Sequence, residues 1–276
     1  MTLSCLKTPE FFLPFRRPAL VVGHPGHELR VFGWMCEHRP LVCVLTDGSG
    51  RHGISRLAST AKLIAQSGAR SGEVFGPVSD SGMYRALLEK NIPLFLDILN
   101  DIADSMVRHD IDFVAGDASE GFNPTHDICR VLVNGAVALA ERASGRPISN
   151  YEFCLTEWEQ HCQERHDSRC MHLRLEDEML RRKLDAAAGY VEMKDEVRQA
   201  IAERGEEYFR VECFRKVSRP LAQVEDSGKP YYETWGEQRV AQGEYGSVIR
   251  LNEHMLPVMA AVRDHVAAVD LSAASV

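Results

Sequence analysis

The alternation of short apolar runs with helical patterns is the feature of this sequence that most restricts its fold. The run 41–45 holds only apolar side chains, which is typical of a strand buried on both faces of a parallel sheet. Further strands are expected at 19–22, 73–76 and 112–116. Strands that alternate with helices form parallel sheets with right-handed crossovers and bind ligands at their carboxyl ends. The sequence therefore predicts an α/β fold with a Rossmann-like, doubly wound, mostly parallel sheet.

The helical patterns divide the chain into three parts. In the first half, helices are expected at 28–38, 55–67, 87–107 and 128–143. Beyond about residue 151 the pattern changes to a charged helix over 174–204 and a strand over 208–217. On that helix, one apolar stripe is formed by Met193, Val197, Ala200 and Ile201. We expect an N-terminal arm (1–17), a Rossmann-like core (18–150) and an α+β C-terminal extension (151–276) packed on the core.

Charge and cysteine usage exclude several classes of protein. The net charge of -8 argues against a nucleic-acid partner, which a basic surface would bind. No apolar stretch reaches the 18 residues of a spanning helix, and the N-terminus lacks the pattern of a secretory signal. The eight cysteines are scattered and form no C-x-x-C pair, as expected for reduced thiols. We expect a cytoplasmic protein with a small-molecule substrate and no membrane partner, and the oligomeric state stays open.

Two similar junctions follow the first and fourth expected strands. Residues 24–28 read His-Pro-Gly-His-Glu, and residues 123–127 read Asn-Pro-Thr-His-Asp. Proline is preferred at the first position of a helix, so His27 and His126 are both expected at the third. A helix N-terminus disfavours the imidazolium form and keeps each ring able to bind a metal. With His24, they would form the three-ligand set of a catalytic zinc site. The residues alone favour this site no more than a set of capping and surface histidines.

At these junctions the sequence resembles the PIG-L/LmbE-like family of zinc-dependent N-deacetylases. The family motif His-Pro-Asp-Asp-Glu compares with residues 24–28, and His-Pro-Asp-His compares with residues 123–126. The family's Thr-Asp-Gly compares with residues 46–48, and the resemblance covers roughly 18–145. It implies that His24 and His126 bind Zn²⁺ or another divalent metal, with His27 where the family has an aspartate ligand. It also implies that Arg56 and Asp80 contact polar groups of the substrate.

Two departures from the family motifs affect the predicted chemistry. Gly26 stands where the family has the aspartate that acts as general base, and Asn123 replaces a histidine near the substrate carbonyl. We expect Glu120, and after it Asp117, to accept the proton, although either carboxylate is equally explained as a solvated loop residue. Glu28 is better explained as a first-turn helix residue. Asn123 is a candidate donor to the oxyanion, although capping the following helix is its more common role.

The leading functional hypothesis is a metal-dependent hydrolase that removes an N-acyl group from an amino sugar or a small biosynthetic intermediate. The alternative is a metal-binding relative that has lost hydrolysis and binds a ligand or catalyses a different reaction. A nucleotide-binding protein that cradles phosphate at 46–50 is disfavoured, because no G-x-G-x-x-G follows the first strand. A histidine and cysteine cluster at 161–172 fits no standard zinc spacing and is expected to be a polar helix or loop.

Overall fold

The computed structural model describes residues 17–50, 53–156, 170–218 and 228–273. Nearly all of the expected N-terminal arm (1–17) and most of the cluster at 161–172 lie outside these ranges. Within them, no helix is long and apolar enough to cross a membrane.

A seven-stranded sheet in the order β3-β2-β1-β4-β5-β7-β6 forms the centre of the molecule. Strands β1 to β5 are parallel, whereas β7 runs antiparallel to both β5 and β6. The order reverses between β1 and β4, which makes their carboxyl ends the topological switch point. The predicted doubly wound, mostly parallel sheet is confirmed. The strands are β1 (Pro18–Val22), β2 (Leu41–Thr46), β3 (Arg70–Val78), β4 (Phe113–Asp117), β5 (Ser149–Phe153), β6 (Cys170–Arg174) and β7 (Val211–Lys216).

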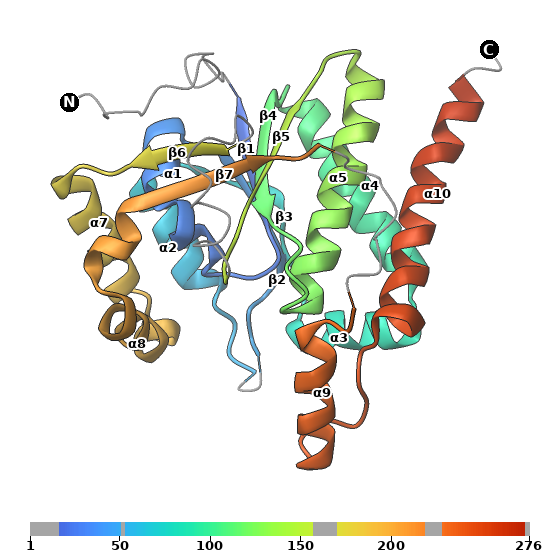
Figure 1. The fold of residues 1–276 in the computed structure, drawn as a ribbon. Coiled ribbons are helices and arrows are strands. Elements are labelled where there is room, and N and C mark those ends of the chain that lie inside the picture. Colours follow the sequence, from blue (N-terminus) through green and yellow to red (C-terminus); the bar gives the residue numbers. More distant parts are fainter. Residues whose placement is uncertain (1–16, 51–52, 157–169, 219–227, 274–276) are drawn as a thin grey trace.

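Helices cover both faces of the sheet, with α1 and α2 on one side and α4, α5 and α10 on the other (Figure 1). The α-helices are α1 (Phe32–His38), α2 (Leu57–Ser67), α3 (Asp80–Glu89), α4 (Ile92–Arg108), α5 (Pro124–Ser144), α7 (Asp177–Ala188), α8 (Lys194–Arg204), α9 (Tyr231–Ala241) and α10 (Leu256–Ala273). Short helical turns are η2 (His27–Val31), η3 (Val191–Met193), η4 (Glu206–Arg210) and the π-type η5 (Leu251–Met255).

Alternating side chains of the central strand β1 enter two separate cores. Ala19 and Val21 pack with the α4, α5 and α10 layer, whereas Leu20 and Val22 pack with Trp34 of α1. All five residues of β1 and all six of β2 are buried. This double burial explains why the sequence shows unbroken apolar runs at these positions.

Three helix predictions need correction. The helix expected over 87–107 is two helices, α3 and α4, because Lys90 adopts a left-handed backbone (φ 51°) and Asn91 caps α4 through Leu94 N. The helix expected over 174–204 is likewise divided, with a break at Gly189 and the turn η3 between α7 and α8. The helix expected over 28–38 begins as the 3-10 turn η2.

A buried ion pair fastens the C-terminal extension to the core. The Glu212 carboxylate on β7 accepts hydrogen bonds from Gly33 N and Trp34 N, each at 2.8 Å, and from Lys183 Nζ of α7 at 2.9 Å. Glu212 is only 1% exposed and Lys183 only 3%. The extension therefore supplies the hydrogen-bond acceptor for two amides at the start of α1.

Candidate active site

The carboxyl ends of β1 and β4 bring the three predicted histidines together. His24 follows β1, and His126 occupies the third position of α5, which follows β4. Because β1 and β4 are paired neighbours, both chains leave the sheet at one edge. The ring centroid of His24 lies 5.3 Å from the centroid of His27 and 5.3 Å from that of His126. The centroids of His27 and His126 are 4.5 Å apart.

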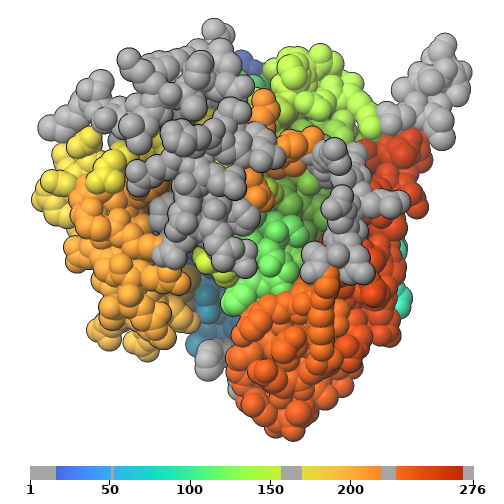
Figure 2. Space-filling view, in the orientation of Figure 1, coloured from blue at the N-terminus to red at the C-terminus, as the bar shows by residue number. Residues whose placement is uncertain are grey.

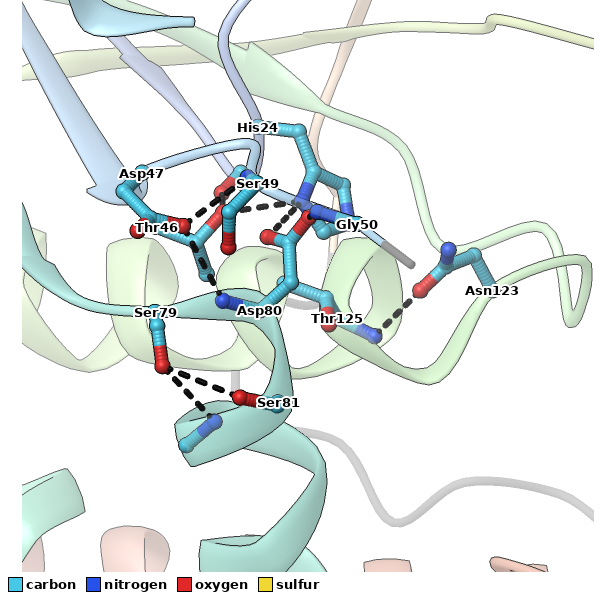
Figure 3. Close-up of polar contacts among 12 residues, drawn as sticks. His24, Thr46, Asp47, Ser49, Gly50, Ser79, Asp80, Ser81, Asn123 and Thr125 are labelled. Atoms are coloured by element: carbon cyan, nitrogen blue, oxygen red, sulfur yellow. Dashed lines mark hydrogen bonds and ion pairs between the residues drawn. The ribbon is translucent and has the colours of Figure 1, made fainter. Parts of the chain in front are cut away.

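The Nδ1 atom of His24 contacts a threonine and an aspartate (Figure 3). Its Nδ1 lies 2.8 Å from Thr46 Oγ1 and 3.0 Å from Asp80 Oδ1, and Asp80 Oδ2 also accepts a hydrogen bond from Gly50 N. Burial opposes ionisation of Asp80, but its hydrogen bond and charge interaction with His24 hold the pKa of the carboxyl well below its usual range. Asp80, predicted to contact substrate, thus lies against His24 and positions its ring.

A second carboxylate supports His27 in the same way. His27 Nδ1 lies 2.8 Å from Asp117 Oδ2, which also accepts a hydrogen bond from Gly23 N at 2.7 Å. Asp117 is fully buried, and its Oδ1 has no hydrogen-bond partner. Burial lowers the pKa of His27, but the neighbouring Asp117 outweighs it and the net pKa is raised.

His126 is the only one of the three histidines that is buried. It is 6% exposed, and burial, with the charges of His27 and His24, lowers its pKa well below the usual value. The ring is therefore neutral near pH 7. His126 Nδ1 and His24 Nε2 are both buried and have no hydrogen-bond partner.

Three neighbouring imidazoles are the kind of group that a metal site uses. Rings that share a tetrahedral zinc have centres roughly 5 Å apart, since each zinc–nitrogen bond is about 2.0–2.1 Å. Two orphaned ring nitrogens also need a partner, since buried polar groups are normally satisfied. In the described part of the chain, however, no group of three or more His, Cys, Asp or Glu residues is arranged to hold an ion as it stands.

The two histidine junctions differ more than their sequences suggest. Pro124 begins α5 as predicted, but Pro25 begins no helix, and His27 is the first residue of η2 rather than the third. The reason is Gly26, whose φ of 106° turns the chain before the helix starts. A Cβ at position 26 would overlap with Met193 Sδ of η3. The space beside position 26 is therefore filled by a methionine from the C-terminal extension.

The other predicted site residues hold local structure. The Glu120 carboxylate accepts hydrogen bonds from Leu155 N at 2.8 Å and from Thr156 N at 2.9 Å, which fixes two loops to each other. Asn123 Oδ1 caps α5 by accepting from Thr125 N at 2.8 Å. Arg56 is the N-cap residue of α2, and its carbonyl oxygen accepts a hydrogen bond from the Tyr190 hydroxyl.

Glu28 also has a structural place. Its buried carboxylate accepts hydrogen bonds from Gly26 N at 2.7 Å and Thr60 Oγ1 at 2.6 Å. Burial raises its pKa, and the hydrogen bonds only partly offset this. Glu28 therefore fixes the Gly26 turn.

An apolar pocket beside the histidines was not predicted. It has a volume of about 310 Å³, and Gly26, His27 and His126 form part of its wall. Most of the rest comes from α7, α8 and η4. In Figure 2 these elements lie on the left, in yellow and orange, and α9 lies at the lower right, in darker orange. The apolar stripe on α8 was the sequence signal for this wall. A second pocket of about 340 Å³, between α2 and α7, includes none of the predicted site residues.

Solved deacetylase structures share this fold. No protein-family model matches the chain, and a search of curated proteins found no match. The zinc-inhibited form of teicoplanin deacetylase Orf2 has a TM-score of 0.52 at 12% identity, and the A40926 pseudoaglycone deacetylase Dbv21 has 0.51 at 16%. A deacetylase–bog complex from teicoplanin biosynthesis gives 0.51 at 13%. Each match covers 76% of this chain and 100% of the other. At these identities the likeness establishes the fold alone.

Proposed function

We propose that this deacetylase-fold chain is a metal-dependent hydrolase that removes an N-acyl group from an amino sugar or a small biosynthetic intermediate. The observation that carries the proposal is the cluster of three imidazoles at the switch point, two of them backed by carboxylates, of which Asp117 is fully buried. The names of the structural neighbours, all deacetylases, support the same reaction class.

In this proposal His24, His27 and His126 hold the metal ion, with Zn²⁺ as the first candidate. A bound ion of this kind polarises a carbonyl and lowers the pKa of water toward neutrality. Asp80 and Asp117 accept the Nδ1 protons of His24 and His27, which fixes the tautomer whose Nε2 is a lone-pair donor. The low pKa of His126 keeps its ring neutral and able to donate a lone pair.

The proton acceptor stays a prediction, with Asp117 and Glu120 as its candidates. Asp117 contacts His27, and its Oδ1 is buried without a partner, whereas Glu120 is bound to Leu155 and Thr156. Asn123 uses its side-chain oxygen in the helix cap, so its amide nitrogen is the group that would donate to a developing oxyanion. The contact of Arg56 with polar substrate groups stays a prediction.

Release of free amine from a panel of N-acetyl amino sugars tests this function. The wild-type chain, supplied with Zn²⁺, is expected to release amine, and His126→Ala is expected to abolish the release. His265→Ala is the matched control, since His265 lies on α10 and contacts Asn100 of α4 instead. Tight metal binding without hydrolysis by any metal tested would contradict the proposal.

A second candidate is a metal-binding protein that binds its ligand without hydrolysing it. The specific observation in its favour is that Gly26 carries no carboxylate and that Met193 fills the space where one would stand. The same assay separates the two candidates. Zinc bound by the wild-type chain, lost in His126→Ala and accompanied by no amine release, would favour this second function.

A further inference from the structure

The pocket next to His27 and His126 has walls that are almost entirely apolar. The contributing side chains come from four separated segments, and they are Leu29, Phe122, Leu155, Leu184, Met193, Val197, Ala200, Ile201 and Phe209. Its volume of about 310 Å³ corresponds to roughly ten water-sized volumes of about 30 Å³ each. The pocket therefore has room for several methylene groups, and its apolar walls are unsuited to a hydrated polar group.

Helix α8 turns its apolar stripe toward this pocket instead of toward a core. Val197, Ala200 and Ile201 lie at helical spacing and line the pocket, yet no residue of α8 is buried. An apolar stripe on a surface helix normally packs against protein. Here the stripe faces open volume, which leaves it to be covered by a ligand.

Polar groups on the pocket wall are already engaged elsewhere. Lys183 Nζ donates to Glu212 at 2.9 Å and to the Arg30 carbonyl oxygen at 2.8 Å, so only its aliphatic stem is left to face the pocket. Thr156 Oγ1 donates to Glu120 at 2.7 Å. The Arg30 guanidinium lies over the Tyr208 ring, 5.4 Å from its centroid. These contacts leave Glu196 of α8 and the two histidines as the main polar groups offered to an occupant.

We propose that this pocket binds the apolar acyl chain of the substrate, with a preferred length of about eight to ten carbons. The inference rests on the proposed function, because it places the scissile amide at the three histidines and the chain along α7 and α8. A methylene that enters such a pocket raises affinity by up to about fourfold. The preferred substrate class is therefore a medium-chain N-acyl amine, with N-acetyl amines hydrolysed less efficiently.

An acyl-length series tests the proposal directly. For glucosamine amides carrying acyl chains of two to twelve carbons, kcat/KM is expected to rise stepwise to eight or ten carbons and then level off. Ala200→Trp, which fills the pocket, is expected to remove this rise. Ala202→Trp is the matched control, because Ala202 lies on the same helix, is exposed and does not line the pocket.

Binding of decanoate, followed by calorimetry, separates failure of the pocket from failure of the hydrolase. Decanoate bound by wild type and Ala202→Trp but lost in Ala200→Trp supports the pocket, even if no amide is hydrolysed. Acetyl amides hydrolysed with no chain-length effect, and no decanoate binding, would overturn the pocket and leave the hydrolase standing. A length dependence seen only when the chain is on the amine side, as in N-acetyl alkylamines, would also overturn it.

Discussion

Substitution of Gly26 by alanine should destabilise the protein through two separable effects. The backbone φ of 106° places a Cβ in a left-handed conformation, which costs about 1–2 kcal/mol in the free energy of unfolding. The same Cβ would overlap with Met193 Sδ, and overpacking of this kind costs about 1–3 kcal/mol. We therefore expect Gly26→Ala to lower the free energy of unfolding by about 2–5 kcal/mol.

A double-mutant cycle with Met193→Ala isolates the second effect. Once the methionine is removed, Gly26→Ala should cost only the backbone term of about 1–2 kcal/mol. The coupling energy between the two positions is then about 1–3 kcal/mol. Urea unfolding of the four proteins, followed by circular dichroism, measures all of these values.

Gly145 supplies the control for the backbone term alone. It also has a positive φ (66°), but nothing lies within 4 Å of its missing Cβ. Gly145→Ala should cost about 1–2 kcal/mol, equally with and without Met193. If Gly26→Ala costs the same in both Met193 backgrounds, the overlap plays no part and the reasoning about position 26 is refuted.

Three further predictions concern other contacts. Asp117→Asn should weaken Zn²⁺ binding by about 10- to 100-fold, because the ring of His27 loses the carboxylate that orients it. An unchanged Zn²⁺ affinity in a chelator competition would contradict this role of Asp117. Glu212→Gln should lower the free energy of unfolding by about 3–5 kcal/mol, since Lys183 loses its buried partner; a urea midpoint like that of wild type would exclude this role. Ser105 and His109 lower the pKa of Glu73 to about 2, so its stabilising effect is present above the unfolded pKa of about 4.5 and is lost as pH falls toward 2. The difference in the free energy of unfolding between wild type and Glu73→Gln should therefore shrink between pH 5 and pH 2. A difference that stays constant would show that ionised Glu73 does not stabilise the fold.

Those parts of the fold that depend on local pattern could be predicted from the sequence. The apolar run of β2 indicated a strand buried on both faces, and parallel strands placed the ends of β1 and β4 at one edge. That placement was enough to anticipate that His24, His27 and His126 would lie together. The break at Lys90 was missed because the apolar spacing continues from α3 into α4 without interruption.

Features that depend on contacts between distant segments could not be predicted. Nothing local to Gly26 indicates that Met193, from the C-terminal extension, fills the space beside it. Glu120 looked like a free acid because its partners, Leu155 and Thr156, follow a strand 35 residues later. The contact of Asp80 with His24 likewise joins segments that are 56 residues apart in the sequence.

The Glu212 contact has a consequence for the timing of folding during synthesis. Its partners, Gly33 N and Trp34 N, precede it by 179 and 178 residues. At about 5–20 residues per second, a ribosome needs roughly 9–36 s to make the intervening chain. Throughout that interval the first turn of α1 lacks the acceptor that completes it. The nascent core is therefore a candidate client for chaperones until the strand that carries Glu212 has emerged.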